Sequence, residues 1–147
     1  MPIWCEIISQ DRVVFEGEAD IVILPGSEGE MGILPNHAPL LSTLNYGVMK
    51  VRRHGKEQFF TVAGGIVEVR PDRVVVLTDA AENIEEIDVQ RAEEAKRRAE
   101  EYLKAGPPPD TDEYLAMEAA LRRSNLRLEA ARKYRGPSMP SYRREGS

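Results

Sequence analysis

The chain has 147 residues, of which 41% are apolar and 31% charged, and its formal net charge is −5. This length suits one compact domain or a small domain with an appendage, while the negative charge argues against bulk binding of nucleic acid. No apolar run approaches the roughly 20 residues that span a bilayer, the N-terminus predicts no secretion signal, and the single cysteine, Cys5, excludes an internal disulfide and a cysteine metal cluster.

Residues 1–82 carry short β-branched runs separated by turn signals, a pattern typical of an antiparallel sandwich or barrel. We expect strands near residues 3–8, 13–15, 19–24, 47–52, 58–63, 66–70 and 73–78. Turns are expected at Pro25-Gly26, His54-Gly55, Gly64-Gly65 and Pro71-Asp72. The pair Gly64-Gly65 also predicts a bulge or a close approach of the backbone.

Residues 83–135 differ in character, because charged residues and alanine dominate and β-branched residues almost vanish. A first helix is expected from the N-cap residue Asp88 to about Lys104. Its apolar stripe follows the period of an amphipathic helix and consists of Ala92, Ala95, Ala99, Tyr102 and Leu103. The glycine and three prolines of residues 106–109 are expected to end this helix.

A second helix is expected from a capping box formed by Asp110 and Glu113 to about Tyr134. Its seam has 3–4 spacing and modest side chains: Tyr114, Met117, Leu121, Ser124, Leu128 and Ala131. We expect an antiparallel helical hairpin with weak attachment and a disordered tail. The chain is thus predicted to be α+β, with a β-sandwich over residues 1–84, a helical hairpin over 85–135 and a tail over 136–147.

The segment 27–41, SEGEMGILPNHAPLL, combines two glycines, two prolines, acids and a histidine between strands. It is interpreted as a well-formed loop, as a contact surface on a rigid scaffold, or as a catalytic loop with His37 as base and Glu28 or Glu30 as its partner. The sequence offers little support for catalysis, because it has only two histidines and contains no G-x-S-x-G nucleophile motif or glycine-rich phosphate loop.

Four helical arginines suggest a second feature. Arg91 and Arg98 are seven residues apart on the first helix, and Arg123 and Arg127 are four apart on the second, so each pair shares a helix face. These faces are either solvated surface or an anion site that forms when the helices fold together, since guanidinium groups donate paired hydrogen bonds to phosphate and carboxylate.

Three segments resemble the epsilon subunits of F-type ATP synthases: GSEGEMGILPNHAPLL (residues 26–41), VAGGIVEVRPDRVVVL (62–77) and IDVQRA (87–92). The resemblance runs in one register from about residue 3 to residue 134. It implies a flattened β-sandwich of about ten strands, followed by a two-helix hairpin.

The resemblance also implies a role and partners. Such a subunit is a non-catalytic rotor component of the proton-translocating ATP synthase, held peripherally at the cytoplasmic face of the cell membrane. It packs on the gamma subunit and touches the polar loops of the c-ring, through a loop similar to the one with Glu30 and His37. Its helices fold on the sandwich or extend into the catalytic head of alpha and beta subunits, where they inhibit ATP hydrolysis; Arg122 and its neighbours would meet an acidic loop there.

In some members of that family the folded helices bind ATP through an I/L-D-x-x-R-A motif, which Ile87, Asp88, Arg91 and Ala92 match here. The resemblance adds further positions: Arg98, Arg123, Arg127 and Glu82. It therefore implies no required cofactor but a regulatory ATP. The stiff proline link at residues 107–109 departs from the family's polar turn and favours an open hairpin.

Two other functions remain open at this point. A free-standing β-sandwich adaptor with a helical hairpin would purify alone and never follow membranes. A small hydrolase built around His37 would have a histidine with a perturbed pKa in a pocket and measurable turnover.

Overall fold

The computed structural model describes residues 1–106 and 111–135. The chain divides into two compact units, Met1–Asn83 and a second unit that begins at Ile84. Among the described residues, no helix is both long and apolar enough to cross a membrane.

The first unit is a β domain whose described residues form eight strands. They are β1 (Ile3–Ile8), β2 (Val13–Ala19), β3 (Ile21–Gly26), β4 (Gly29–Ile33), β5 (Leu40–Arg53), β6 (Lys56–Arg70), β7 (Arg73–Leu77) and β8 (Ala81–Asn83). The strand order is β2-β1-β7-β6-β5-β3-β4, and β8 pairs with β6. Neighbouring strands are antiparallel except for β1 and β7, which run parallel. The predicted α+β class, with strands first and helices second, is confirmed.

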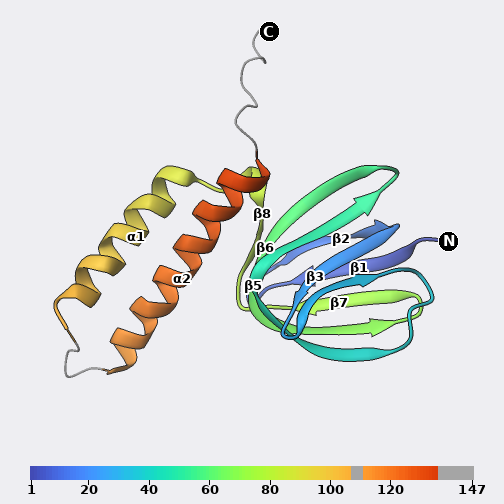
Figure 1. Cartoon of the computed structure of the whole chain (residues 1–147), viewed down its shortest axis with the longest axis horizontal. Helices are drawn as coiled ribbons and strands as arrows, with labels where there is room; N and C mark the ends of the chain where they lie inside the picture. Colours follow the sequence, from blue (N-terminus) through green and yellow to red (C-terminus); the bar gives the residue numbers. More distant parts are fainter. Residues whose placement is uncertain (107–110, 136–147) are drawn as a thin grey trace, which may run out of the picture. The chain divides into compact units, whose positions relative to one another are not determined.

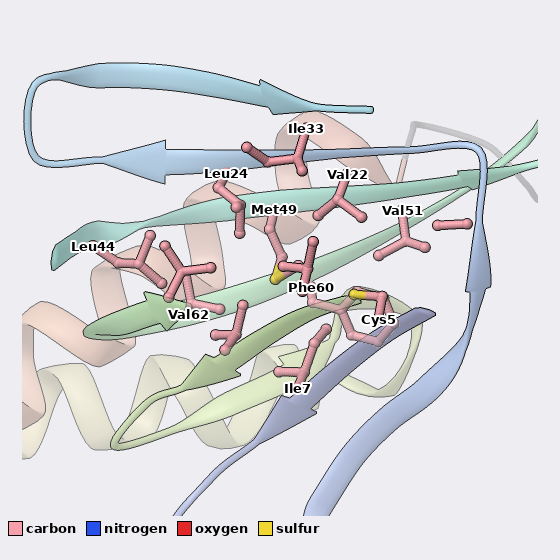
Figure 2. Packing of buried hydrophobic residues seen from close by; sticks show 14 of the residues in the cluster. Cys5, Ile7, Val22, Leu24, Ile33, Leu44, Met49, Val51, Phe60 and Val62 are labelled. Atoms are coloured by element: carbon pink, nitrogen blue, oxygen red, sulfur yellow. The ribbon is translucent and has the colours of Figure 1, made fainter. Parts of the chain in front are cut away.

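In the longest strand, β6, the buried side chains switch from even-numbered to odd-numbered positions partway along the strand. Its core residues lie at even positions before the glycine pair and at odd positions after it: Phe60, Val62, Val67 and Val69. An ordinary pleated strand keeps its parity, so the chain must rotate at Gly64 and Gly65, where φ is +72° and +117°. Both halves of β6 therefore bury side chains in one core, together with residues of β1, β3, β5 and β7. Figure 2 shows Phe60 and Val62 of the first half in this core.

The predicted close approach of the backbone at the glycine pair is confirmed. A Cβ atom on Gly65 would lie 2.1 Å from the carbonyl oxygen of Leu77 and 2.8 Å from the Cα of Thr78. The prediction of a turn at the same place is wrong, because β6 continues through both glycines while pairing with β5. For the same reason β5 and β6 are strands of 14 and 15 residues, and the described strands number eight rather than about ten.

The turn predicted at Pro25-Gly26 is also wrong. These two residues end β3, and β4 lies inside the segment that the sequence assigned to a loop. Gly26 pairs with Gly29, and a Cβ on Gly26 would lie 2.7 Å from the Gly29 carbonyl oxygen, so the tight approach of two glycines closes this hairpin. The turns at His54-Gly55 and Pro71-Asp72 are confirmed.

The second unit is a helical hairpin. It consists of a short 3-10 turn, η1 (Ile84–Glu86), and two antiparallel helices, α1 (Val89–Lys104) and α2 (Thr111–Tyr134) (Figure 1). The predicted helix positions and stripes are confirmed: Ala92 and Ala99 are buried on α1, as are Ser124 and Ala131 on α2. The predicted capping residue Asp110, the prolines 107–109 and the tail 136–147 lie outside the described residues.

The rotation at the glycine pair yields a stability prediction. Gly65→Ala adds a Cβ against the Leu77 carbonyl and a side chain at positive φ, so it should lower the free energy of unfolding by about 3–5 kcal/mol. Gly55→Ala is the control, because Gly55 has φ +78° with nothing within 4 Å of its Cβ position and should cost only about 1–2 kcal/mol. Denaturant titration followed through the fluorescence of Trp4 on β1 measures both; equal losses would contradict this account.

Candidate functional site

The residues 87–92 at the start of α1 have distinct structural positions. Ile87 is 4% exposed and Ala92 is fully buried. Asp88 is the N-cap, and its carboxylate accepts a hydrogen bond from the backbone N–H of Arg91 at 3.1 Å, as N-cap side chains do. The Arg91 side chain itself is exposed. Helix packing and capping thus account for three of the motif residues, and the guanidinium of Arg91 is the group left to meet a ligand.

The helix seam places the four candidate arginines on a common side of the hairpin. Arg91 and Arg98 each directly precede a buried alanine of α1, and Arg123 directly precedes the buried Ser124 of α2. Arg127 lies four residues after Arg123 and shares its face. A position just before a seam residue and one just after it lie on opposite flanks of a helix with 3.6 residues per turn.

The opposite flank is marked by a groove of about 560 Å³. Its lining includes positions that directly follow seam residues: Glu93 on α1, and Asn125 and Arg132 on α2. On both helices, the residues that directly follow seam residues line this one groove. The residues that directly precede seam residues must therefore lie together on the opposite side of the hairpin. The hairpin therefore gathers Arg91, Arg98, Arg123 and Arg127 on the side away from this groove.

The four guanidinium groups on that side differ in their exposure and in their bonding. Arg98 and Arg123 are exposed, and their side chains form no hydrogen bond or ion pair within the described part of the chain. Arg127 is half-buried and has an interaction of its own. A set of arginines on one side of the hairpin can donate paired hydrogen bonds to a phosphate-bearing anion. Glu94 and Glu101 also directly precede stripe residues of α1, so these two exposed carboxylates share that side.

Glu82 belongs to the first unit of the chain, not to the helical hairpin. It is on β8 in the first unit, opposite Thr61 of β6, whose hydroxyl donates to the Glu82 carbonyl oxygen at 3.4 Å. The other residues of the predicted nucleotide set belong to the second unit. Arg122, predicted to contact a partner, is exposed on α2.

The candidate contact residues Glu30 and His37 lie on and after β4. Glu30 is exposed on β4, an edge strand of the sheet, opposite Pro25. His37 follows Asn36, which has φ +66° and whose N–H donates to the Pro71 carbonyl at 2.8 Å. This bond ties the segment to the turn after β6, so the contact surface sits on a rigid support.

The contacts of His37 do not support the hypothesis that residues 27–41 form a catalytic loop. His37 Nδ1 donates to the carbonyl oxygen of Ala38 at 2.8 Å, and within the described residues its ring has no carboxylate partner. Cys5 is fully buried, which raises the pKa of its thiol to about 12 and keeps it from acting as a thiolate. In residues 1–106 and 111–135 no group of three or more His, Cys, Asp and Glu side chains is placed to hold a metal ion.

One surface escaped the sequence reasoning. Ile66 of β6 is 41% exposed and Leu77 of β7 is 44% exposed, and the two are direct cross-strand neighbours. The same row continues to Thr43 on β5 and to Ile8 on β1. We call these four residues, three of which are aliphatic, the outer apolar row. The signal was present in the sequence, because Ile66-Val67 breaks the alternation of a strand with one wet face.

The comparisons with known proteins cover both units. A family model described as the beta-sandwich domain of the ATP synthase delta/epsilon chain matches residues 3–84. A second model, described as the long alpha-helix domain of the same chain, matches residues 85–132.

Curated relatives match over most of their length. A protein named ATP synthase epsilon chain from Dehalococcoides mccartyi is 47% identical over 136 residues, which are 88% of this chain and 92% of the relative. One of the same name from Herpetosiphon aurantiacus is 41% identical over 132 residues, 90% of this chain and 96% of the relative.

Solved structures of ATP synthases contain similar chains. One is in the cryo-EM structure of the Euglena gracilis mitochondrial ATP synthase with OSCP, F1 and c-ring. It matches with a TM-score of 0.59 and 26% sequence identity, and the match covers 87% of this chain and 76% of that chain. A chain in the central stalk and c-ring structure of the Tetrahymena thermophila enzyme shares the fold, with TM-score 0.55 at 13% identity, over 90% of this chain and 98% of that one.

Proposed function

The chain belongs to the ATP synthase delta/epsilon family, and from that membership we propose that it is a rotor subunit of the central stalk that links gamma to the c-ring and restrains ATP hydrolysis. The observation that carries the proposal is the likeness to epsilon chains across both units, at 41% to 47% identity over about nine-tenths of the chain. We further propose that it is non-catalytic and reaches the cytoplasmic face of the membrane only through the complex.

Two surfaces of the β domain suit the two rotor partners. The outer apolar row lies on a rigid sheet and is flanked by the highly exposed Leu41, a composition suited to a permanent protein contact such as gamma. The polar, exposed Glu30 and the supported segment of His37 suit the polar loops of the c-ring. The assignment of the apolar row to gamma extends the roles implied by the sequence.

The outer apolar row can be tested by polar substitution. Ile66→Ser with Leu77→Ser should weaken association with the isolated gamma subunit at least tenfold, because two aliphatic side chains leave the contact and tenfold corresponds to only about 1.4 kcal/mol for the pair. The control is Val13→Ser on the edge strand β2, where the side chain is 52% exposed and outside the row. Surface plasmon resonance measures the affinity; equal binding by all three chains would place gamma elsewhere.

The second unit is proposed to bind ATP when its helices are folded together. The shared side of Arg91, Arg98, Arg123 and Arg127 supports phosphate binding, while Asp88 keeps its carboxylate on the helix cap. An exposed site of this kind would have an affinity between micromolar and millimolar, about −8 to −4 kcal/mol.

Calorimetry on the isolated chain tests this site. ATP should bind with measurable heat, and Arg91→Ala or Arg127→Ala should abolish the signal because each removes a phosphate donor. Arg97→Ala is the matched control, since Arg97 is exposed on α1 and lies two positions before the buried Ala99, away from the shared side. Absence of heat at millimolar ATP would overturn the nucleotide proposal and leave the rotor role intact.

The hairpin is further proposed to be a movable inhibitory arm. Its fully buried seam residues are small, and the large ones, Met117, Leu121 and Leu128, are only half-buried. Full burial of a large apolar side chain contributes about 1.5–3 kcal/mol, whereas ordering the backbone costs about 1–2 kcal/mol per residue. The folded arrangement is therefore only marginally favoured, as a switch requires, and ATP bound to it would shift the balance toward folding.

Hydrolysis by the assembled enzyme tests the arm. Deleting residues 107–147 should raise the ATP hydrolysis rate without loss of assembly, and Arg122→Glu in the full chain should raise it partly, because an exposed cation of α2 is lost from the proposed contact with the head. The assay compares these enzymes over a range of ATP concentrations. Equal rates for truncated and full-length complexes at every concentration would show that the arm does not inhibit.

A further inference from the structure

The last described residue, Arg135, ties the end of α2 to the segment that precedes α1. Its Nη2 donates hydrogen bonds to the carbonyl oxygens of Ile84 at 2.7 Å and Ile87 at 2.6 Å. Its own backbone N–H still donates to the Ala131 carbonyl at 3.1 Å, so helical bonding fixes the position from which the side chain reaches across. Both bonds lie within the second unit.

The two carbonyl groups have little alternative bonding in the folded chain. Ile87 precedes the N-cap Asp88, so its carbonyl lies outside the bonding pattern of α1. From the backbone of the described residues, the Ile84 carbonyl accepts one long bond, 3.3 Å, from the N–H of Ile87 directly after η1. The side chains of both isoleucines are buried, at 1% and 4% exposure, so this segment is anchored. A guanidinium that bonds two such carbonyls forms charge-assisted hydrogen bonds, the stronger kind.

The Arg135 bonds lie where they can control whether the two helices separate. The covalent connection between the helices, residues 105–110, joins the end of α1 to the start of α2, and the Arg135 bonds join the opposite ends. In between lies the seam of Ala92, Ala99, Ser124 and Ala131, whose small side chains offer little apolar area. Separation of the helices at the end far from the connection therefore requires that the Arg135 bonds break.

We propose that Arg135 is a latch that holds the helical hairpin closed and sets the fraction of molecules in which α2 is released. The existence of the latch concerns the isolated chain alone; its regulatory meaning rests on the proposed inhibitory arm. It is distinct from the proposed nucleotide site, because Arg135 lines the groove with Glu93, Asn125 and Arg132, on the side away from the four candidate arginines.

The chain supplies a matched control three residues earlier. Arg132 lines the same groove and carries the same charge, but its guanidinium pairs with Glu129 on α2 itself at 2.6 Å. Both side chains of that pair are mostly exposed, at 70% and 64%. Arg132→Gln therefore removes the same charge from the same end of the helix without cutting a bond between α2 and the start of α1.

Hydrogen exchange of the full-length chain, followed by mass spectrometry, tests the latch. In Arg135→Gln, amides of residues 114–128 should exchange about tenfold faster or more, the factor expected for loss of charge-assisted hydrogen bonds. Arg132→Gln should leave these rates unchanged, and amides of β5 and β6 should stay protected in both variants. Equal rates in the two variants, or faster exchange confined to the last turn of α2, would overturn the proposal.

The assembled enzyme separates failure of the latch from failure of the proposed function. If the arm inhibits, Arg135→Gln should lower ATP hydrolysis, opposite in sign to deletion of residues 107–147. If the deletion leaves hydrolysis unchanged while exchange in Arg135→Gln still accelerates, the latch stands and the inhibitory role fails. If the deletion raises hydrolysis but exchange is the same as in Arg132→Gln, the arm stands and the latch is rejected.

Discussion

The β domain depends on the contact between the Gly65 backbone and the Leu77 carbonyl. Only a residue without a Cβ fits there, and the positive φ of Gly64 and Gly65 rotates β6 so that its two halves present opposite parities to one core. Without this rotation, one half of β6 would point its valines at solvent. The outer apolar row follows from the same rotation, because Ile66, the residue after the pair, faces outward at the point where the parity changes.

The two units use different kinds of packing. The β domain buries large side chains such as Phe60, Ile7, Leu24 and Met49 completely, which suits a permanent structural part (Figure 2). The helices bury mainly alanine and serine, and polar bonds gather at the end of the hairpin away from the connection: the Asp88 cap and the Arg135 bonds. Burial of large apolar groups is strong and non-directional, whereas a few directional bonds can be broken and remade as a unit. A fixed rotor body with a movable arm is consistent with this difference.

Sequence reasoning identified the helices well and the strand connections less well. The N-cap Asp88 and the 3–4 spacing of α2 are local signals, and both led to the observed elements. The errors at Pro25-Gly26 and Gly64-Gly65 have a common cause: glycine permits a turn and also permits close packing of strands, and only distant partners decide between them. The segment of β4 has a poor strand composition and forms only because β3 offers its edge. The shared side of the four arginines required the antiparallel register of the helices, and the Arg135 bonds required three-dimensional proximity to a turn about fifty residues away.

The small seam between α1 and α2 has a thermodynamic consequence. Heat capacity rises mainly when apolar surface meets water. Parting two faces whose fully buried residues are Ala92, Ala99, Ser124 and Ala131 exposes less of it than unfolding the core of the β domain. The opening of the hairpin would therefore have a small heat-capacity change, and its free energy would vary almost linearly with temperature. The β domain would instead follow the curved stability profile of an ordinary core. If the hairpin opens as proposed, its open fraction would therefore change steadily with temperature, while the β domain keeps its own curved profile.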